Sequence, residues 1–233
     1  MGILGEIQKI WYGRSNTSYI NHLRNKGISV GENVLFRDPF TTLIDFSRPA
    51  LIKIGNNVDI NRHFQILTHD WGAYVFRNKY HDLLNSEGGV TIGNNIYFGT
   101  NVIILKGVTI GDNCIIGAGS IVNRSIPANS VATGNPCKVV CTLDEYYEVR
   151  KQKGLAEAVE HVKAIRQRYG RDPLLKEMYE EFIYFVNNNN AEFYESKGVP
   201  VKKQLGEAYD DWLKYHRSKF KDFEEFLTYI TTK

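Results

Sequence analysis

A period of six residues dominates the stretch from Val90 to Pro127. Bulky apolar residues recur at every sixth position, at Ile92, Phe98, Ile104, Ile110, Ile116 and Val122. A second apolar series accompanies them, at Ile96, Val102, Val108, Cys114 and Ile126. Glycine, asparagine and aspartate stand between the apolar residues, and glycine and asparagine in particular tolerate a left-handed backbone at low cost. A helix needs apolar residues every three or four positions, and a long strand alternates without such regular turns, so the stretch predicts neither.

The pattern predicts very short strands separated by turns that recur every six residues. Apolar residues two positions apart lie on the same face of a strand. A chain that turns this often in one sense coils into a β-solenoid, in which each coil pairs with the coils above and below it. We therefore expect a mainly β protein built around a parallel β-helix.

The same six-residue spacing extends back to Val30, although some of its positions there hold polar residues. Positions 30, 36, 42, 48, 54, 60 and 66 hold Val, Phe, Thr, Arg, Ile, Ile and Ile, and the companion positions 34, 40, 46, 52, 58 and 64 hold Val, Phe, Phe, Ile, Val and Phe. We therefore predict coils from Val30 through Leu67. Ile66 and Ile92 are 26 positions apart, which is not a multiple of six, so residues 70–89 are predicted to form an excursion loop. Its aromatic content argues against disorder and favours a functional loop on a rigid scaffold.

Helical patterns flank the predicted solenoid. Residues 1–27 are expected to form a helical cap over its open end, built on Ile7, Ile10, Trp11, Ile20 and Leu23. Beyond the solenoid the period becomes helical, at Leu155, Val159, Val162 and Ile165, then between Leu175 and Val186, and again between Trp212 and Ile230. We therefore divide the chain into a cap (1–27), a β-helix domain (28–141) and an α-helical C-terminal extension (142–233).

Composition narrows the classes of function. The chain has 233 residues, of which 42% are hydrophobic and 24% charged, and a formal net charge of +3, which gives no argument for nucleic acid. Cys114, Cys137 and Cys141 show neither metal-ligand spacing nor an even disulfide count, which favours a reducing, cytoplasmic compartment. No apolar run approaches membrane-spanning length, and the N-terminal residues lack the order of a signal peptide, so no membrane insertion is expected.

The repeats resemble those of the hexapeptide-repeat acyltransferases, whose [Leu/Ile/Val]-Gly-x-x-x-x units build a left-handed parallel β-helix. That hand is an exception to the usual right-handed crossover and is implied by the resemblance alone. Over about residues 20 to 141 the chain is similar to the galactoside, maltose and colanic-acid type O-acetyltransferases. The resemblance implies an enzyme that uses acetyl-CoA as acyl donor, requires no metal and forms a homotrimer with active sites between subunits.

The run Thr68-His69-Asp70-Trp71 stands where the coils break into the excursion. Sugar-modifying members of the family carry a similar Ser-His-Asp-aromatic run, so the resemblance implies that His69 is the general base. An imidazole titrates close enough to neutral pH to accept the proton of a sugar hydroxyl that attacks a thioester carbonyl. Either Asp70 or a backbone carbonyl is expected to orient the ring, and the alternative role of Asp70 is a structural turn.

The last coils resemble the coenzyme A groove of the family, and by resemblance the backbone around Gly99 and Thr100 lies near the thioester. The run Gly134-Asn135-Pro136-Cys137-Lys138 is similar to the family's terminal element, although Cys141 stands where a second cation often follows. The residues expected to bind coenzyme A are Tyr97, Gly99, Thr100, Gly117, Ala118, Asn123, Arg124 and Lys138.

The acceptor is less well specified. The expected acceptor-binding residues are Asp38, Trp71, Tyr74 and His81. A hydroxyl of a sugar or of a surface-polysaccharide precursor is the first choice because of the His-Asp-aromatic run. An antibiotic such as a streptogramin and an amino-sugar nitrogen are alternatives, and serine is the least favoured.

Two other classes of function compete with the acyltransferase. A zinc carbonic anhydrase on the same solenoid requires three convergent histidines, for which His63, His69 and His81 are the only candidate set. Residues six apart lie on neighbouring faces of a three-sided coil, so His63 and His69 are expected to diverge. A non-catalytic scaffold is the second alternative.

Overall fold

The computed structural model describes residues 15–232. The predicted cap residues Ile7, Ile10 and Trp11 therefore lie outside the described residues. The chain divides into two compact units, one up to Tyr147 and one from Glu148 onward.

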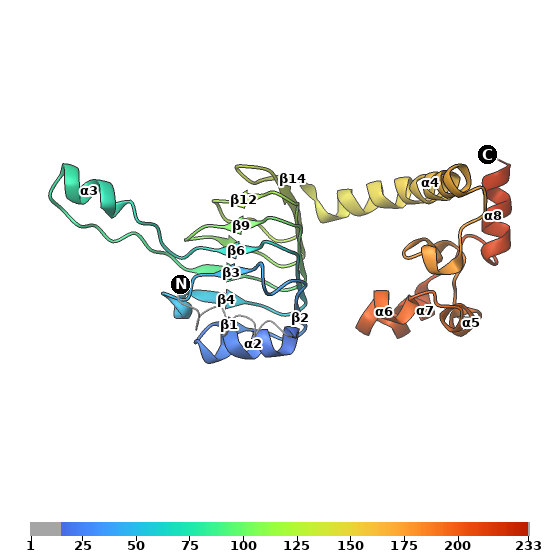
Figure 1. Cartoon of the computed structure of the whole chain (residues 1–233), viewed down its shortest axis with the longest axis horizontal. Helices are drawn as coiled ribbons and strands as arrows, with labels where there is room; N and C mark the ends of the chain where they lie inside the picture. Colours follow the sequence, from blue (N-terminus) through green and yellow to red (C-terminus); the bar gives the residue numbers. More distant parts are fainter. Residues whose placement is uncertain (1–14, 233) are drawn as a thin grey trace. The chain divides into compact units, whose positions relative to one another are not determined.

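The first unit is a coil of short parallel strands in three sheets, stacked as in Figure 1. The first sheet contains β1 (Ser29–Val30), β4 (Ile52–Ile54), β7 (Val90–Ile92) and β10 (Thr109–Ile110). The second contains β2 (Val34–Phe36), β5 (Val58–Ile60), β8 (Ile96–Phe98), β11 (Cys114–Ile116), β13 (Ser130–Thr133) and β14 (Lys138–Thr142). The third contains β3 (Leu43–Ile44), β6 (Gln65–Ile66), β9 (Ile103–Ile104) and β12 (Ile121–Val122). The predicted fold class, a left-handed parallel β-helix with a helical C-terminal extension, is confirmed.

Asparagine ladders turn the chain between the first and second sheets. Asn95 and Asn113 have φ of 55° and 58°, and the Asn95 amide donates to Oδ1 of Asn113 over 2.8 Å. The glycine before them is required by close approach, because a Cβ on Gly93 would lie 2.4 Å from Oδ1 of Asp112 in the next coil. The Gly-Asn-Asn runs of the sequence thus mark corners where only a short or absent side chain fits.

The predicted apolar frame fills the inside of the coil. Every member of the six-residue series from Ile92 to Val122 is buried, and so is its companion series. Aromatic rings contribute to this core, and Phe64 packs against Phe98 of the next coil with ring centroids 4.9 Å apart. Period-two burial in each short strand therefore gives one continuous core.

The first coil departs from the predicted frame. Phe40 and Phe46 were expected to face inward, but they are 46% and 41% exposed, and the buried residues between them include Thr42 and Ile44. The reason is the length of the preceding corner: β2 pairs with β5 at an offset of 24 residues, whereas Leu43 pairs with Gln65 at an offset of 22. The longer corner moves the third strand two positions along the sequence.

Most of the predicted site residues lie in two of the three corners between the sheets. Corner 2, between the second and third sheets, comprises residues 37–42, 61–64, 99–102 and 117–120. Corner 3, between the third and first sheets, comprises residues 45–51, 67–89, 105–108 and 123–125. The excursion belongs to corner 3: Ile54 pairs with Ile92, 38 positions on, whereas Ile92 pairs with Ile110, 18 positions on. It carries the helix α3 (Ala73–Lys79) away from the coils (Figure 1).

Both ends of the solenoid are covered. The helix α2 (Asn16–Asn25) buries Tyr19 and Leu23 against the first coil. The Asn16 side chain donates to the carbonyl of Val34 and accepts from the amide of Phe36, which satisfies the open edge of β2. At the other end, parallel pairing continues past Pro127 to β13, and β14 folds back antiparallel on it.

The second unit has its own apolar core. It contains most of α4 (Leu143–Tyr169), followed by η2 (Leu175–Glu177), η3 (Glu181–Tyr184), α5 (Ala191–Ser196), α6 (Val201–Leu205), η4 (Gly206–Ala208), α7 (Tyr209–Tyr215) and α8 (Phe223–Thr231). The helical pattern between Leu175 and Val186 forms two short 3₁₀ turns instead of one helix, although Met178 and Phe182 are buried. Within residues 15–232, no helix combines the length and apolar character needed to cross a membrane.

Candidate active site

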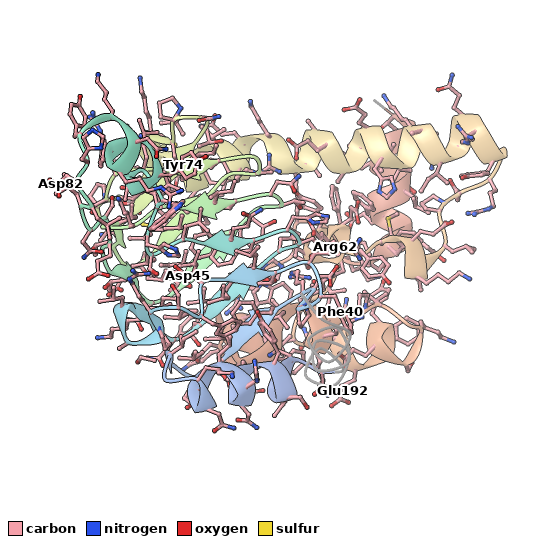
Figure 2. The ribbon with its side chains drawn as sticks, turned by 60° about the vertical axis from the view of Figure 1, so that its left-hand side comes forward. Phe40, Asp45, Arg62, Tyr74, Asp82 and Glu192 are labelled. Carbon is pink, nitrogen blue, oxygen red and sulfur yellow. The ribbon has the colours of Figure 1, made fainter. Side chains whose placement is uncertain are left out.

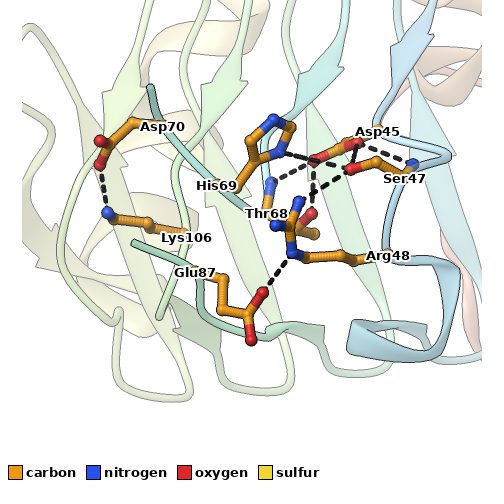
Figure 3. A network of polar contacts seen from close by, with 8 residues as sticks. All are labelled: Asp45, Ser47, Arg48, Thr68, His69, Asp70, Glu87 and Lys106. Atoms are coloured by element: carbon orange, nitrogen blue, oxygen red, sulfur yellow. Dashed lines mark hydrogen bonds and ion pairs between the residues drawn. The ribbon is translucent and has the colours of Figure 1, made fainter. Parts of the chain in front are cut away.

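His69 lies at the root of the excursion in corner 3 and is held there by Asp45. Nδ1 of His69 is 2.6 Å from Oδ2 of Asp45, and the imidazole side chain is 37% exposed. Because a carboxylate accepts a proton at this distance, the neutral ring carries its hydrogen on Nδ1 and a lone pair on Nε2. Nε2 makes no hydrogen bond to any residue between 15 and 232 (Figure 3). The ring can therefore accept a proton from a bound molecule.

Asp45 is a buried carboxylate whose two oxygens are both occupied. Oδ1 accepts hydrogen bonds from the amide and hydroxyl of Ser47 over 2.9 and 2.6 Å. Oδ2 accepts from the amide and hydroxyl of Thr68 as well as from His69. Burial alone would raise the pKa of Asp45, but the hydrogen bonds from Ser47, Thr68 and His69 outweigh it and hold the pKa well below its usual range. The ionised carboxylate can stabilise an imidazolium that forms when His69 takes a proton.

Arg48 links this carboxylate to the returning end of the excursion. Its Nη1 donates to Oγ of Ser47 over 3.1 Å, and its Nε donates to the carboxylate of Glu87. Glu87 in turn forms an antiparallel backbone bridge with His69. The hydrogen bond from Arg48 lowers the pKa of Glu87, so both partners of the pair are charged. The contacts thus run from Glu87 through Arg48 and Ser47 to Asp45 (Figure 3).

Asp70, the residue expected to orient His69, faces away from it. Its carboxylate accepts hydrogen bonds from Lys106, from Oγ of Ser86 over 2.8 Å and from the amide of Gly72 over 2.9 Å. The hydrogen bond from Lys106 is the main reason that the pKa of Asp70 lies well below its usual range. Asp70 therefore joins the outgoing and returning ends of the excursion to the next coil, and the contact with the imidazole belongs to Asp45 (Figure 3).

The residues expected to bind coenzyme A lie in several places on one chain. Four of them line corner 2 in two successive coils: Gly99, Thr100, Gly117 and Ala118. They pack tightly, because a Cβ on Gly99 would lie 2.5 Å from the amide nitrogen of Ala118. Tyr97 is exposed on the outer face of the second sheet, Asn123 and Arg124 are exposed in corner 3, and Lys138 is exposed at the start of β14. Within one chain the third sheet separates corner 2 from His69.

The expected acceptor residues divide between the same two corners. Trp71, Tyr74 and His81 belong to the excursion and are exposed, and the Arg77 guanidinium lies 4.6 Å from the ring centroid of Tyr74. Asp38 lies in corner 2, where its Oδ1 accepts from the amide of Phe40 over 3.1 Å. Figure 2 shows this separation: Asp45 and Tyr74 lie toward one side of the solenoid, and Phe40 and Arg62 toward the other.

The histidine set of the carbonic-anhydrase alternative does not converge. His63 lies in corner 2 with φ of 59°, His69 in corner 3 and His81 in the excursion. Across residues 15–232, no three His, Cys, Asp or Glu side chains are grouped as a metal site would need. The geometry therefore gives this alternative no ligand set.

Sequence reasoning did not identify Asp45, Ser47, Arg48 or Lys106. A regular coil of 18 residues would place residue 51 next to position 69, whereas the enlarged first coil brings Asp45 there. A usable signal was present, because an acidic residue directly follows the short apolar pair Leu43–Ile44 in the coil before His69. Finding it requires the length of the first coil, which the 18-residue period does not give.

Comparisons with known proteins agree with this architecture. The model of the family described as bacterial transferase hexapeptide (six repeats) matches residues 89–124. Protein CapG of Staphylococcus aureus is 40% identical over 124 residues, which cover 53% of this chain and 71% of CapG. Putative acetyltransferase SAV2555 of Staphylococcus aureus strain Mu50 is 41% identical, with 48% of this chain and 64% of that protein covered.

Among solved structures, the chain is similar to a maltose O-acetyltransferase from Clostridium difficile 630. The identity is 31%, the match covers 59% of this chain and 83% of that chain, and the TM-score is 0.41. The matched repeats, the coil geometry and the identity to CapG lead to one conclusion: this chain belongs to the hexapeptide-repeat acyltransferases.

Proposed function

We propose that the protein transfers an acetyl group from acetyl-CoA to a hydroxyl of a sugar or of a surface-polysaccharide precursor, with His69 as general base. The observation that supports this proposal most directly is the pairing of His69 with the ionised, buried Asp45, which leaves Nε2 with a lone pair beside solvent. The acetyltransferase designation of a relative that is 41% identical supports the choice of acyl group.

The proposed reaction needs one base that takes the proton of the acceptor hydroxyl and later gives it to the leaving sulfur. The acceptor hydroxyl gives its proton to Nε2 of His69 while its oxygen attacks the thioester carbonyl, and Asp45 stabilises the resulting imidazolium. Backbone amides near Gly99 and Thr100 are the proposed donors to the tetrahedral oxyanion. When the tetrahedral intermediate collapses, the C–O bond between the acceptor oxygen and the acetyl carbon is kept and the C–S bond of the thioester breaks. The proton passes from His69 to the departing thiolate sulfur of coenzyme A.

The proposed assembly is a homotrimer in which each active site lies between two chains. The outward residues of the third sheet are mostly apolar, namely Leu43, Gln65, Ile103 and Ile121, whereas those of the first sheet are Ser29, Lys53, Thr91 and Thr109. An apolar sheet face is expected to pack against a partner. Packing of neighbouring chains over the third sheet would bring corner 2 of one chain opposite His69 of the next and complete the site.

The remaining site residues keep their proposed roles. The coenzyme would lie along Gly99, Thr100, Gly117 and Ala118, with Tyr97 beside it and its phosphates near Asn123, Arg124 and Lys138. Trp71, Tyr74 and His81 would meet the acceptor from the excursion, and Asp38 from corner 2. Asp70 is proposed to hold the excursion and not to touch the reacting atoms.

The proposed activity is tested by thiol release from acetyl-CoA with a panel of acceptors. The panel holds simple sugars, nucleotide sugars, an amino sugar, a streptogramin and serine, and mass spectrometry identifies the acetylated atom. We expect O-acetylation of at least one sugar hydroxyl. Acetylation of the streptogramin or of the amino nitrogen alone would replace the proposed acceptor class, and thioester stability with every acceptor would refute the enzyme.

A further inference from the structure

An open pocket lies at corner 2. Its volume is about 630 Å³, and it is lined by Leu35, Arg37, Asn61, Arg62 and Thr100. These residues come from three successive coils, which backbone hydrogen bonds hold in register: the amide of Arg37 donates to the carbonyl of Ile60, and the amide of Asn101 donates to the carbonyl of Arg62, each over 2.9 Å. The hydrogen bonds between the coils therefore hold the wall of the pocket in place, and Thr100 is part of that wall.

The two arginines of this pocket, Arg37 and Arg62, differ in how closely a carboxylate holds them. Arg37 is already engaged by a carboxylate, since its Nε and Nη2 contact Oδ1 and Oδ2 of Asp59 over 2.8 and 2.6 Å. This two-point pair occupies the edge of the guanidinium formed by Nε and Nη2. Arg37 is therefore expected to shape the pocket and to hold little capacity for a further anion.

Arg62 keeps its hydrogen-bonding capacity. Its Nε is 3.9 Å from Oδ2 of Asp38, which is too long for a hydrogen bond, and its side chain is 68% exposed. The other carboxylate oxygen of Asp38, Oδ1, accepts a hydrogen bond from the amide of Phe40. A guanidinium offers five N–H donors in a planar fork that matches carboxylate and phosphate oxygens. Arg62 thus forms a long ion pair with Asp38 that leaves its N–H donors without a hydrogen bond to that carboxylate, in a pocket next to Thr100.

We propose that the acceptor carries an oxyanion, the carboxylate of an acidic sugar or the phosphate of a sugar phosphate or nucleotide sugar, and that Arg62 binds it. The inference rests on the proposed function, because the acceptor must lie between Thr100 at the thioester and the earlier coils. Asn61 borders the same pocket, and its amide donates to the hydroxyl of Tyr97 over 3.4 Å, so Arg62 has a polar neighbour in the wall. Asp38, 3.9 Å from Arg62, competes with an entering anion for the guanidinium and is therefore the residue expected to set the specificity of the site.

The experiment compares three acceptors that differ at one group: galactose, galacturonic acid and galactose 1-phosphate. We expect kcat/KM of the wild type to be roughly 10- to 100-fold higher for at least one of the two anions than for galactose, the range of one charge-assisted hydrogen-bonded contact. Which of the two anions is preferred distinguishes a carboxylate from a phosphate. In Arg62→Gln this preference should be lost through KM, and Arg62→Lys should restore part of it. Lys53→Gln, on the outer face of the first sheet, is the control and should keep it.

Binding of the same three compounds, measured by calorimetry without acetyl-CoA, separates this proposal from the enzymatic one. Binding of an anion that Arg62→Gln weakens, in a protein that never consumes the thioester, would refute the acetyltransferase and keep the anion site. Equal kcat/KM for the three acceptors, or an equal loss for all three in Arg62→Gln, would overturn the anion site and keep the enzyme. Absence of Arg62-dependent anion binding together with absence of turnover would overturn both.

Discussion

The side chain of Asp45 accepts a hydrogen bond from His69 although the two residues are 24 positions apart in the sequence, and the distance between Oδ2 and Nδ1 is 2.6 Å. The pair joins two successive coils at the corner where the excursion leaves the solenoid. Asp70, the immediate neighbour of His69, takes no part in it and pairs with Lys106. The two carboxylates therefore have separable roles, which mutation can distinguish.

Asp45→Asn should reduce kcat by roughly 10²- to 10⁴-fold, the range seen when the carboxylate that orients a catalytic histidine is replaced by an amide. Asp70→Asn, the matched variant on the other carboxylate, should keep kcat within about threefold and raise KM for the acceptor instead, because it loosens the excursion. Thiol-release kinetics at saturating acetyl-CoA measure both. A larger loss of kcat in Asp70→Asn than in Asp45→Asn would reverse the assignment.

Asp45 should also make the free energy of unfolding depend on pH in the acidic range. Its pKa is lowered in the folded protein from an ordinary value of 3.8, so its contribution is complete above that pH and is lost progressively as the pH falls below it. The difference in unfolding free energy between wild type and Asp45→Asn should be largest near pH 7 and smaller at pH 3. Chemical denaturation at the two pH values measures this difference, and a gap that widens in acid would contradict the ionised carboxylate.

Arg48 should act on the reaction through Ser47 and Asp45 without touching the substrates. Arg48→Gln breaks the contact with Glu87, so we expect kcat to fall about tenfold, equivalent to roughly 1.4 kcal/mol in the transition state, and the excursion to become more sensitive to limited proteolysis. Arg171→Gln, which breaks a comparable surface pair with Glu177 in the helical unit, is the control and should change neither. Faster cleavage without any change in kcat would restrict Arg48 to a structural role.

The proposed trimer predicts that the third sheet, and not the first, is the face that packs between chains. Ile103→Glu places a carboxylate on the outer face of β9 and should cost roughly 3 kcal/mol or more per interface, giving monomers that lose activity. Thr91→Glu makes the same change on the outer face of β7 and should leave the assembly intact. Sedimentation velocity distinguishes the two, and a fully active monomeric Ile103→Glu would contradict active sites shared between chains.

The sequence predicts the regular part of this fold and loses accuracy where the coils change length. From Ile92 to Val122 the spacing alone predicts which side chains are buried, because each coil there repeats after 18 residues. Phe40 and Phe46 are misplaced because an enlarged corner shifts the third strand, which a local pattern does not reveal. The enlarged first coil also hides Asp45, whereas His69 is found because it marks the break in the period.

The most direct test of His69 as general base is the rate of thiol release from acetyl-CoA in His69→Ala and in a second histidine variant. His63→Asn is the matched control, because asparagine tolerates the positive φ of that corner and His63 lies outside the network around Asp45. We expect His69→Ala to lose at least about 10²-fold in kcat, and His63→Asn to keep the kcat of the wild type. Full turnover in His69→Ala would contradict the proposed mechanism.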